Sequence, residues 1–257
     1  MKLAFDTYAH LNSPLHRWEP RCKLVGLMGL IFAFATLSSL WLVPIMFGIT
    51  LGLYLASKLP WSFLIQRLRY PGFFLLGTIA VLPLAVGETV LWEWGIISVY
   101  SEGCLAVVLI SFRFICIFAI ASILFGTAPF LTMIKAMGKL GLPAVLGDMM
   151  LLTYRYLTEL SDRLRTMKIA MRLRGFDAKQ FRWRKLRVLA NLAGTLLVRS
   201  YEQSERVYDA MRLRGYGQHR ERFNPTSSIA GSDLIATGVM LLVALGLAIA
   251  QYWFIPH

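Results

Sequence analysis

Long apolar blocks recur along this chain of 257 residues, and each approaches the roughly 20 helical residues needed to cross a lipid bilayer. The chain is 57% apolar and only 16% charged, which lies outside the usual range of soluble proteins. We expect five spans, near residues 24–40, 41–56, 71–86, 103–125 and 234–255. The predicted fold class is therefore an all-α membrane protein with about five transmembrane helices.

Lysine and arginine residues indicate the orientation, because cytoplasmic loops of membrane proteins are enriched in both. They cluster before the first predicted span and between the second and third, whereas residues 87–102 carry three glutamates and neither cation. This pattern places the N-terminus and residues 127–231 in the cytoplasm. The predicted organisation is a four-span membrane domain (1–126), a cytoplasmic domain (127–231) and a C-terminal transmembrane helix (232–257).

A seven-residue stretch recurs in the predicted cytoplasmic domain. Residues 170–176 (AMRLRGF) return as residues 210–216 (AMRLRGY), and six of the seven positions are identical. The first copy ends a helix whose apolar residues recur at steps of three and four, and the second ends a helix from about residue 186 to 214. At 1.5 Å per residue, a 25-residue helix reaches about 37 Å. Both helices are too charged to span a membrane, so we predict two long cytoplasmic amphipathic helices.

The arginines of the repeat suit a helix end, because a helix C-terminus carries a partial negative charge. This reading accounts for any single copy of the set Arg172, Arg174, Arg212 and Arg214. Dipole stabilisation does not require the same string twice, however, so the pair predicts two equivalent binding sites on a partner. Arg174 and Arg214 stand last before each break, and a guanidinium forms planar bidentate bonds with carboxylates.

The small residues of the repeat shape the two helix ends. Gly175 and Gly215 are natural C-cap glycines, since glycine adopts the left-handed conformation that often ends a helix. Ala170 and Ala210 keep the last turn slim and allow a partner to approach closely. We expect these four residues to shape the helix ends of the candidate coupling site.

Several stretches together resemble the transmembrane (T) component of energy-coupling-factor (ECF) transporters. The two helix ends of the form Ala-x-x-x-Arg-Gly are the first likeness. Residues 13–24 (SPLHRWEPRCKL) are similar to the family's SPLHRxDPRxKL element, with Glu19 in place of aspartate. Residues 140–143 (LGLP) and 154–156 (YRY) match two further elements, and residues 199–208 resemble the cobalt/nickel branch, the CbiQ/NikQ type. The resemblance covers almost the whole chain.

The resemblance implies partners in the inner membrane of a prokaryote. These are two ABC-type ATPase subunits (CbiO/NikO-like), a substrate-binding membrane subunit (CbiM/NikM-like) and a small accessory subunit (CbiN/NikN-like). It implies that Arg174 and Arg214 insert into grooves on the ATPases, shaped by Ala170, Gly175, Ala210 and Gly215. For Arg172 and Arg212 two roles stay open, an ATPase contact or a nearby salt bridge.

The same resemblance implies that this chain holds no cofactor. ATP and Mg²⁺ belong to the ATPases, and Co²⁺ or Ni²⁺ belongs to the substrate-binding subunit. When ATP draws the ATPases together, the two helix ends approach each other, and the long helices carry that motion to the substrate-binding subunit.

Three other functions compete with this reading. A T component shared among vitamin-binding partners keeps the class and changes the substrate. A membrane-bound enzyme such as a lipid-modifying transferase requires a catalytic cluster, and the sequence has no GxSxG, no HExxH and no metal-ligand spacing among its four histidines. A free-standing secondary transporter predicts inverted repeats, whereas the repeat in this sequence runs in direct orientation within the predicted cytoplasmic domain. Because the sequence also lacks a GxxxxGK[ST] phosphate loop, we expect a non-catalytic subunit.

Two basic features remain outside the repeat. Arg113 lies near the middle of the fourth predicted span, where a cation needs a polar partner. Its role is either a contact with the substrate-binding subunit or a structural pairing within the chain. The basic run at residues 182–187 is read as a contact with anionic lipid rather than with nucleic acid.

Overall fold

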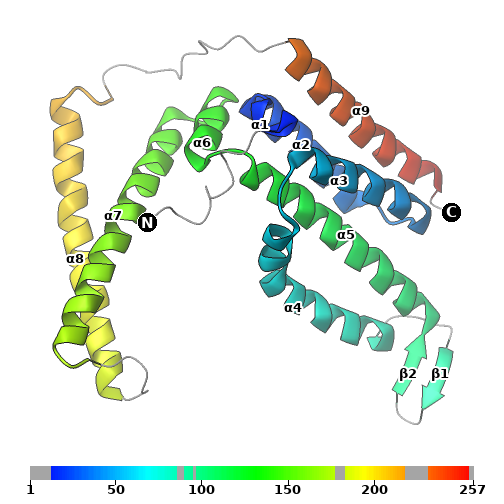
Figure 1. Ribbon diagram of the computed structural model, residues 1–257, viewed down its shortest axis with the longest axis horizontal. Coiled ribbons are helices and arrows are strands. Elements are labelled where there is room, and N and C mark those ends of the chain that lie inside the picture. Colours follow the sequence, from blue (N-terminus) through cyan, green and yellow to red (C-terminus); the bar gives the residue numbers. More distant parts are fainter. Residues whose placement is uncertain (1–12, 86–89, 95–96, 177–182, 218–230, 255–257) are drawn as a thin grey trace. The chain divides into compact units, whose positions relative to one another are not determined.

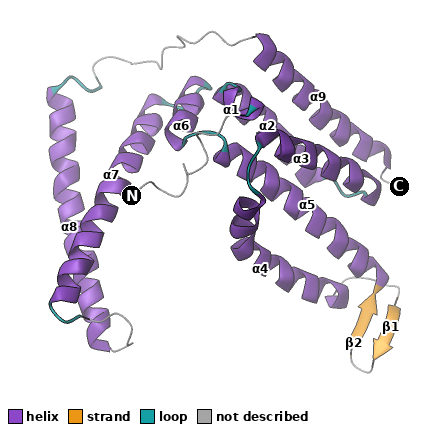
Figure 2. Cartoon of the chain, viewed as in Figure 1, coloured by secondary structure: helices purple, strands orange, loops and turns teal. Residues whose placement is uncertain are grey.

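A computed structural model describes residues 13–85, 90–94, 97–176, 183–217 and 231–254 (Figures 1 and 2). Apart from one pair of short strands, the regular structure of these residues is helical, as the sequence predicts. The elements are α1 (Pro14–Arg17), α2 (Pro20–Thr36), the 3₁₀ turn η1 (Leu40–Leu42), α3 (Val43–Ser57), α4 (Trp61–Ala85), β1 (Val90–Trp94), β2 (Ile97–Tyr100), α5 (Ser101–Gly126), α6 (Phe130–Lys139), α7 (Ala144–Leu173), α8 (Trp183–Leu213) and α9 (Gly231–Phe254).

The chain divides into two compact units. One holds residues 137–225, with α7 and α8, and the other holds residues 2–136 together with 226–257. The division at residue 137 lies ten residues after the boundary at 127 expected from the sequence. The last helix, α9, therefore belongs with α1 to α5 and most of α6, and α7 and α8 lie in the other unit.

The core of the larger unit forms where α2 packs against α5 and α9, and α3 and α4 pack against α5. Leu27, Phe34 and Ile120 are fully buried there. Glycine lets α2 and α9 approach each other: a Cβ atom on Gly29 would lie 2.8 Å from Cδ2 of Leu241. Such close contact at small residues is the usual way in which membrane helices pack.

Polar contacts join α9 to the start and to the end of α2. The carboxylate of Asp233 accepts a hydrogen bond from the backbone N–H of Glu19 (3.2 Å), and its carbonyl oxygen accepts one from the indole of Trp18 (3.3 Å). At the other end, the amide oxygen of Gln251 accepts a hydrogen bond from the backbone N–H of Ser38 (2.7 Å). These contacts hold α9 beside both ends of α2.

Two cations connect α2 and α5. Lys23, fully buried near the start of α2, donates hydrogen bonds to Oγ1 (3.0 Å) and to the carbonyl oxygen (3.4 Å) of Thr127, which follows the last residue of α5. Arg113 of α5 donates in turn to the carbonyl oxygens of Ala35 (3.2 Å) and Leu37 (3.3 Å), at the end of α2. Each helix thus supplies the cation for the other's C-terminus.

Three helical segments are long and apolar enough to cross a membrane: Leu40–Ser57, Ser101–Gly126 and Gly231–Gln251. They correspond to the second, fourth and fifth predicted spans. The third predicted span, near residues 71–86, lies in the longer helix α4, which begins ten residues earlier and is not among these three segments. Pro71 and Pro83 both lie inside α4, and apolar helices tolerate internal proline.

A pair of strands lies in the segment between the third and fourth predicted spans, for which the sequence predicts no regular structure. β1 and β2 pair antiparallel, with Glu93 opposite Ser98 and Trp94 opposite Ile97. Valine, tryptophan, isoleucine and tyrosine, which favour extended structure, supply most of these strand residues. The fourth predicted span begins directly after β2, at Ser101.

Candidate functional site

The first copy of the repeat closes the end of α7 by a defined pattern of backbone hydrogen bonds. The N–H of Phe176 donates to the carbonyl of Met171 (3.0 Å), and the N–H of Gly175 donates to the carbonyl of Arg172 (3.0 Å). Gly175 has a φ of +83°, in the left-handed region that favours glycine. This combination is the Schellman motif, in which the last carbonyls of a helix find partners in the chain that follows.

The second copy closes α8 in the same way. The N–H of Tyr216 donates to the carbonyl of Met211 (3.0 Å), the N–H of Gly215 donates to the carbonyl of Arg212 (2.9 Å), and Gly215 also has a φ of +83°. The expectation that both long helices end at these glycines is confirmed. The second helix, α8, begins at Trp183, three residues before the expected start.

The Schellman motif accounts for part of the repeat. It requires the glycine, and it is commonly accompanied by a contact between the side chains that here are methionine and the aromatic residue. Met171 and Met211 are partly buried, in keeping with that role. The motif satisfies the backbone carbonyls without any side chain, so it does not require arginine or leucine at the three positions before the glycine.

Those three positions face solvent in both copies. Arg172, Leu173 and Arg174 are exposed, and so are Arg212, Leu213 and Arg214. Within the described part of the chain, the guanidinium groups of Arg174 and Arg214 make no hydrogen bond or ion pair with another side chain. The guanidinium of Arg212 lies over the ring of Tyr208, four residues earlier, at 5.8 Å from the ring centroid. The residue four positions before Arg172 is Lys168, which has no ring for Arg172 to contact. Arg174 and Arg214 are therefore placed alike, and Arg172 and Arg212 are not.

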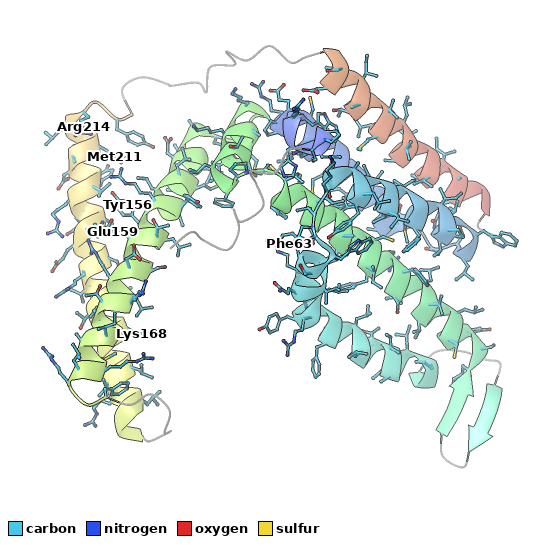
Figure 3. All side chains as sticks on the ribbon, viewed as in Figure 1. Phe63, Tyr156, Glu159, Lys168, Met211 and Arg214 are labelled. Carbon is cyan, nitrogen blue, oxygen red and sulfur yellow. The ribbon has the colours of Figure 1, made fainter. Side chains whose placement is uncertain are left out.

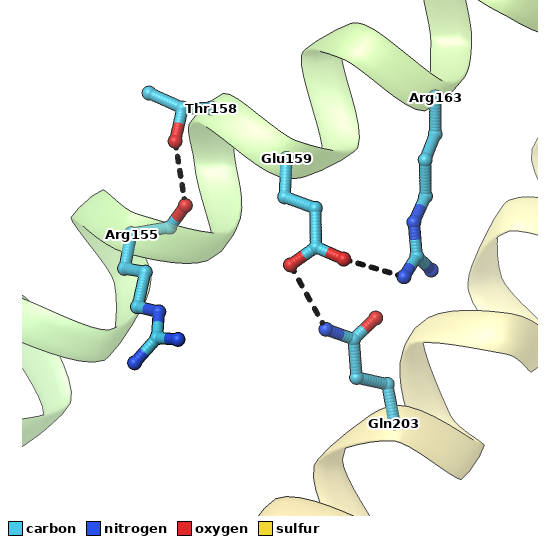
Figure 4. Close-up of polar contacts among 5 residues, drawn as sticks. All are labelled: Arg155, Thr158, Glu159, Arg163 and Gln203. Atoms are coloured by element: carbon cyan, nitrogen blue, oxygen red, sulfur yellow. Dashed lines mark hydrogen bonds and ion pairs between the residues drawn. The ribbon is translucent and has the colours of Figure 1, made fainter.

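Helices α7 and α8 run antiparallel and touch at two polar contacts. Near their middle, Glu159 of α7 accepts a hydrogen bond from the amide of Gln203 of α8 (3.2 Å) and forms an ion pair with Arg163 one turn further along α7 (Figure 4). At the end of α8, the hydroxyl of Tyr216 donates to the carboxylate of Asp148 near the start of α7 (2.9 Å). The carboxylate of Asp148 thereby raises the pKa of Tyr216 above its ordinary value, so the phenol remains protonated.

An open groove of about 570 Å³ lies between α7 and α8. Its lining is largely apolar and includes Leu152, Tyr156 and Val207, together with Met211 and Tyr216 of the second motif. Figure 3 shows Tyr156 and Glu159 along α7, and Met211 and Arg214 in the last turn of α8. The side chains that shape the second helix end are thus part of the contact between the two helices.

The antiparallel arrangement separates the two motifs. Asp148 lies beside the second motif, and the first motif lies 25 residues further along α7. At 1.5 Å per residue, this distance is about 37 Å. The unit therefore presents two equivalent helix ends, one at each end of a pair of crossed helices.

Arg113 has the structural pairing described above, with both hydrogen bonds made to backbone carbonyls of α2. A cation is favourable at a helix C-terminus, and in an apolar environment the carbonyls need a donor. Of the two roles left open by the sequence, these hydrogen bonds support the structural pairing within the chain.

No group of three or more His, Cys, Asp or Glu side chains in the described ranges is arranged to hold a metal ion. The three cysteines are free thiols.

Sequence reasoning missed the contacts that join the two long helices. Asp148, Glu159 and Gln203 stand in no recognisable motif, and their partners lie 44 to 68 residues away in sequence. The strong exposure of Leu173 and Leu213 was also missed, although leucine at the same position of both copies was a visible signal.

Comparison with known proteins identifies relatives along most of the chain. The model of the CbiQ cobalt transport protein family matches residues 11–225. The energy-coupling factor transporter transmembrane protein EcfT of Limosilactobacillus fermentum is 28% identical over 265 aligned residues, which cover 95% of this chain and 97% of that protein. EcfT of Listeria innocua is 28% identical (86% of this chain, 88% of that protein), and EcfT of Streptococcus equi is 26% identical (96% and 95%).

The Schellman geometry predicts opposite effects of alanine at two kinds of glycine. Gly175→Ala and Gly215→Ala each force alanine into a left-handed conformation, which costs about 1–2 kcal/mol. Hydrogen exchange of the amides of residues 175, 176, 215 and 216 should therefore accelerate about tenfold. Gly194 lies inside α8, where an added Cβ meets no atom within 4 Å, so Gly194→Ala should leave exchange unchanged or slow it. Equal effects of all three changes would contradict the motif.

The Tyr216–Asp148 contact predicts a coupling between two substitutions. Tyr216→Phe and Asp148→Ala each remove the hydrogen bond between α8 and α7, and each should accelerate amide exchange in the last turn of α8 a few-fold. The double variant should be no faster than either single one, because the contact is lost only once. Additive effects would show that the two side chains act independently.

The pairing of Arg113 predicts a specific loss of stability. Arg113→Leu leaves the carbonyls of Ala35 and Leu37 without their donor, and hydrogen bonds from charged groups contribute about 1.5–3 kcal/mol. The apparent melting temperature of the detergent-solubilised chain should fall. The melting temperature of Arg113→Lys, which keeps a charged donor, should fall less. A melting temperature of Arg113→Leu equal to that of the native chain would refute the structural pairing.

Proposed function

Because the chain belongs to the CbiQ family of cobalt transport proteins, we propose that it is the transmembrane coupling subunit of an energy-coupling-factor importer. In this role it transmits ATP-driven motion from two ATPase subunits to a substrate-binding membrane subunit. The observation that carries the proposal is the pair of identical helix ends, which present Arg174 and Arg214 in the same backbone geometry.

The two arginines are the proposed contacts with the ATPases. Each is part of a helix end at which the carbonyls of the methionine and of the first arginine already accept backbone N–H groups, and its own guanidinium is available to a carboxylate or carbonyl of a partner. The alanines at positions 170 and 210 are exposed and small, and they leave room for the partner's surface. Arg212 has a neighbour in Tyr208 on its own helix, which supports a lesser part for it in docking.

The construction of the α7–α8 unit supports mechanical transmission. α7 has 30 residues and α8 has 31, so each reaches about 45 Å at 1.5 Å per residue. Their polar contacts are few, and an open groove lies between them. Two stiff helices with so small a contact can change their crossing angle when their ends are pushed together. ATP-driven approach of the two ATPases would supply that push.

ATP chemistry belongs to the partners in this proposal. The sequence of this chain has no phosphate-binding loop of the GxxxxGK[ST] form, so ATP and Mg²⁺ are assigned to CbiO/NikO-like subunits. The chain itself is a non-catalytic subunit without a cofactor. Five spans with a cytoplasmic N-terminus remain the proposed topology.

Cobalt or nickel is the proposed cargo, supported by the description of the matching family. The ion is assigned to a CbiM/NikM-like subunit, with a CbiN/NikN-like accessory subunit. The general transporter name of the EcfT relatives supports a second candidate, a component shared among vitamin-binding subunits. Uptake of labelled Co²⁺, Ni²⁺ and vitamins by cells that carry or lack this chain distinguishes the two candidates.

The proposal predicts a paired effect of arginine substitution. Arg174→Ala together with Arg214→Ala should reduce ATPase subunits co-purified with the chain by at least tenfold, because buried arginines are frequent hot spots of interfaces. ATP-dependent uptake should fall with it, while membrane insertion and the melting temperature stay unchanged.

The matched control changes the other two arginines. Arg172→Ala together with Arg212→Ala removes the same charge from the same helix turns and should have a smaller effect on co-purification. Full uptake and a full complement of ATPases in the Arg174/Arg214 variant would refute the proposed function.

A further inference from the structure

Leucine at one position of the repeat is exposed to an unusual degree. Leu213 is 90% exposed and Leu173 is 85% exposed, the two highest values among large apolar side chains in the described residues. Both are more exposed than the large apolar side chains of the predicted spans, among which Trp41 has the highest value, 83%. The extreme values therefore fall on equivalent positions of the two motifs, outside every predicted span.

The helix end itself does not account for these leucines. The Schellman motif uses backbone groups, the glycine and the contact of methionine with the aromatic residue. Helix propensity does not require leucine either, since glutamine, lysine and glutamate favour helices almost equally. An apolar side chain at this position has no function within the described structure.

The neighbours of Leu213 argue against a lipid-facing helix. One turn earlier on the same face lie Asp209 and Ala210, and two turns earlier lies Arg206. A helix that lies on a membrane has a continuous apolar face, with polar residues on the opposite side. Leu213 is instead a single apolar side chain on a charged face, flanked by the two arginines of the motif. In the first motif Ile169 and Thr166 take the places of Asp209 and Arg206, so this argument rests on the second motif.

We propose that Leu173 and Leu213 are the apolar anchors of the two motifs. Each leucine enters an apolar pocket on one of two copies of the same ATPase subunit, and the arginine that follows it binds carboxylates at the pocket's rim. This inference rests on the proposed coupling function and adds the residues that hold the helix ends in place.

The arrangement of the motifs fits two copies of one partner. The same leucine stands in the same backbone geometry at two sites about 37 Å apart, so the sites call for two equivalent pockets. Flanking arginines complement an acidic rim, while the exposed alanine one turn earlier lets the pocket wall approach. Apolar centres with polar rims are the usual anatomy of such contacts.

The expected contribution of each anchor is large. Complete burial of a leucine side chain corresponds to about a tenfold to hundredfold gain in affinity. The arginines supply charge complementarity and orientation, whereas burial of the leucine supplies affinity that does not depend on charge.

The test replaces leucine with glutamine, which keeps the length and helix propensity of the side chain and removes its apolar character. The variant Leu173→Gln together with Leu213→Gln is compared with Leu197→Gln. Leu197 is 73% exposed on α8 and lies outside the motif, so it is a matched control. A third variant, with methionine at both motif positions, keeps an apolar anchor. Purified ATPase subunits are titrated onto the detergent-solubilised full chain, and their dissociation constants are measured.

We expect the double glutamine variant to bind ATPase subunits at least tenfold more weakly than the native chain, and the Leu197 and methionine variants to bind within threefold of it. Native affinity in the double glutamine variant, with binding lost in the Arg174/Arg214 variant, would overturn the anchors and leave the proposed function standing. Native affinity in both variants would overturn both.

The same titration in lipid nanodiscs separates a protein pocket from a membrane contact. A loss of affinity in detergent and in nanodiscs alike supports the pocket, because detergent micelles contain no bilayer. A loss confined to nanodiscs that contain anionic lipid would mean that the leucines insert into the membrane, and it would overturn the inference.

Discussion

A helix leaves its last carbonyl groups without partners, and in an apolar environment each such group must find a donor. The larger unit solves this problem with cations from neighbouring helices. Lys23 of α2 donates to the residue that follows α5, and Arg113 of α5 donates to the end of α2. This exchange aligns two antiparallel helices and places both charges within the unit. Helix α9 is positioned beside the same helix α2, because Asp233 and Gln251 of α9 accept hydrogen bonds from the residues that flank α2.

The smaller unit solves the same problem without cations. At the ends of α7 and α8 the chain itself supplies the donors, through the backbone N–H groups of the glycine and the aromatic residue. The carbonyls of the methionine and of the first arginine in each motif are consequently paired without any arginine side chain. Arg113 and Arg174 thus have the same charge near a helix C-terminus and different availability: one is engaged by backbone oxygens, and the other is exposed. The glycines of the repeat therefore leave the arginines free to serve as contacts.

Features encoded by local periodicity were predictable from the sequence. The two long helices and their terminal glycines follow from apolar spacing and from the left-handed preference of glycine. Three of the predicted spans also have the length and composition required to cross a membrane. The start of α4 did not follow from the apolar block, because the helix begins ten residues before the predicted span, in a stretch that contains Gln66, Arg67 and Arg69.

Contacts between distant residues were not predictable, since no local pattern specifies them. The need of Arg113 for a partner followed from its position in a span, but the identity of that partner required the relative placement of α2 and α5. The same holds for Glu159, whose partners on two helices are separated by 40 residues of chain, from Arg163 to Gln203. The candidate site was predictable in part. Its residues stand out in the sequence as a repeat, but only the hydrogen bonds of the structure show which of them close the helix and which face outward.

The two helix ends have the same backbone geometry at the motif but differ in their contacts with the other helix. The repeat differs only at its last position, where Tyr216 replaces Phe176, and the additional hydroxyl binds Asp148 of the other helix. This hydrogen bond ties the second motif to the start of α7, and a phenylalanine ring has no hydroxyl with which to make it. Identical partners can bind two identical tips while the unit responds to them differently. In the proposed coupling function, two equivalent ATPases call for two equal tips, and motion delivered in one direction calls for an unequal response behind them.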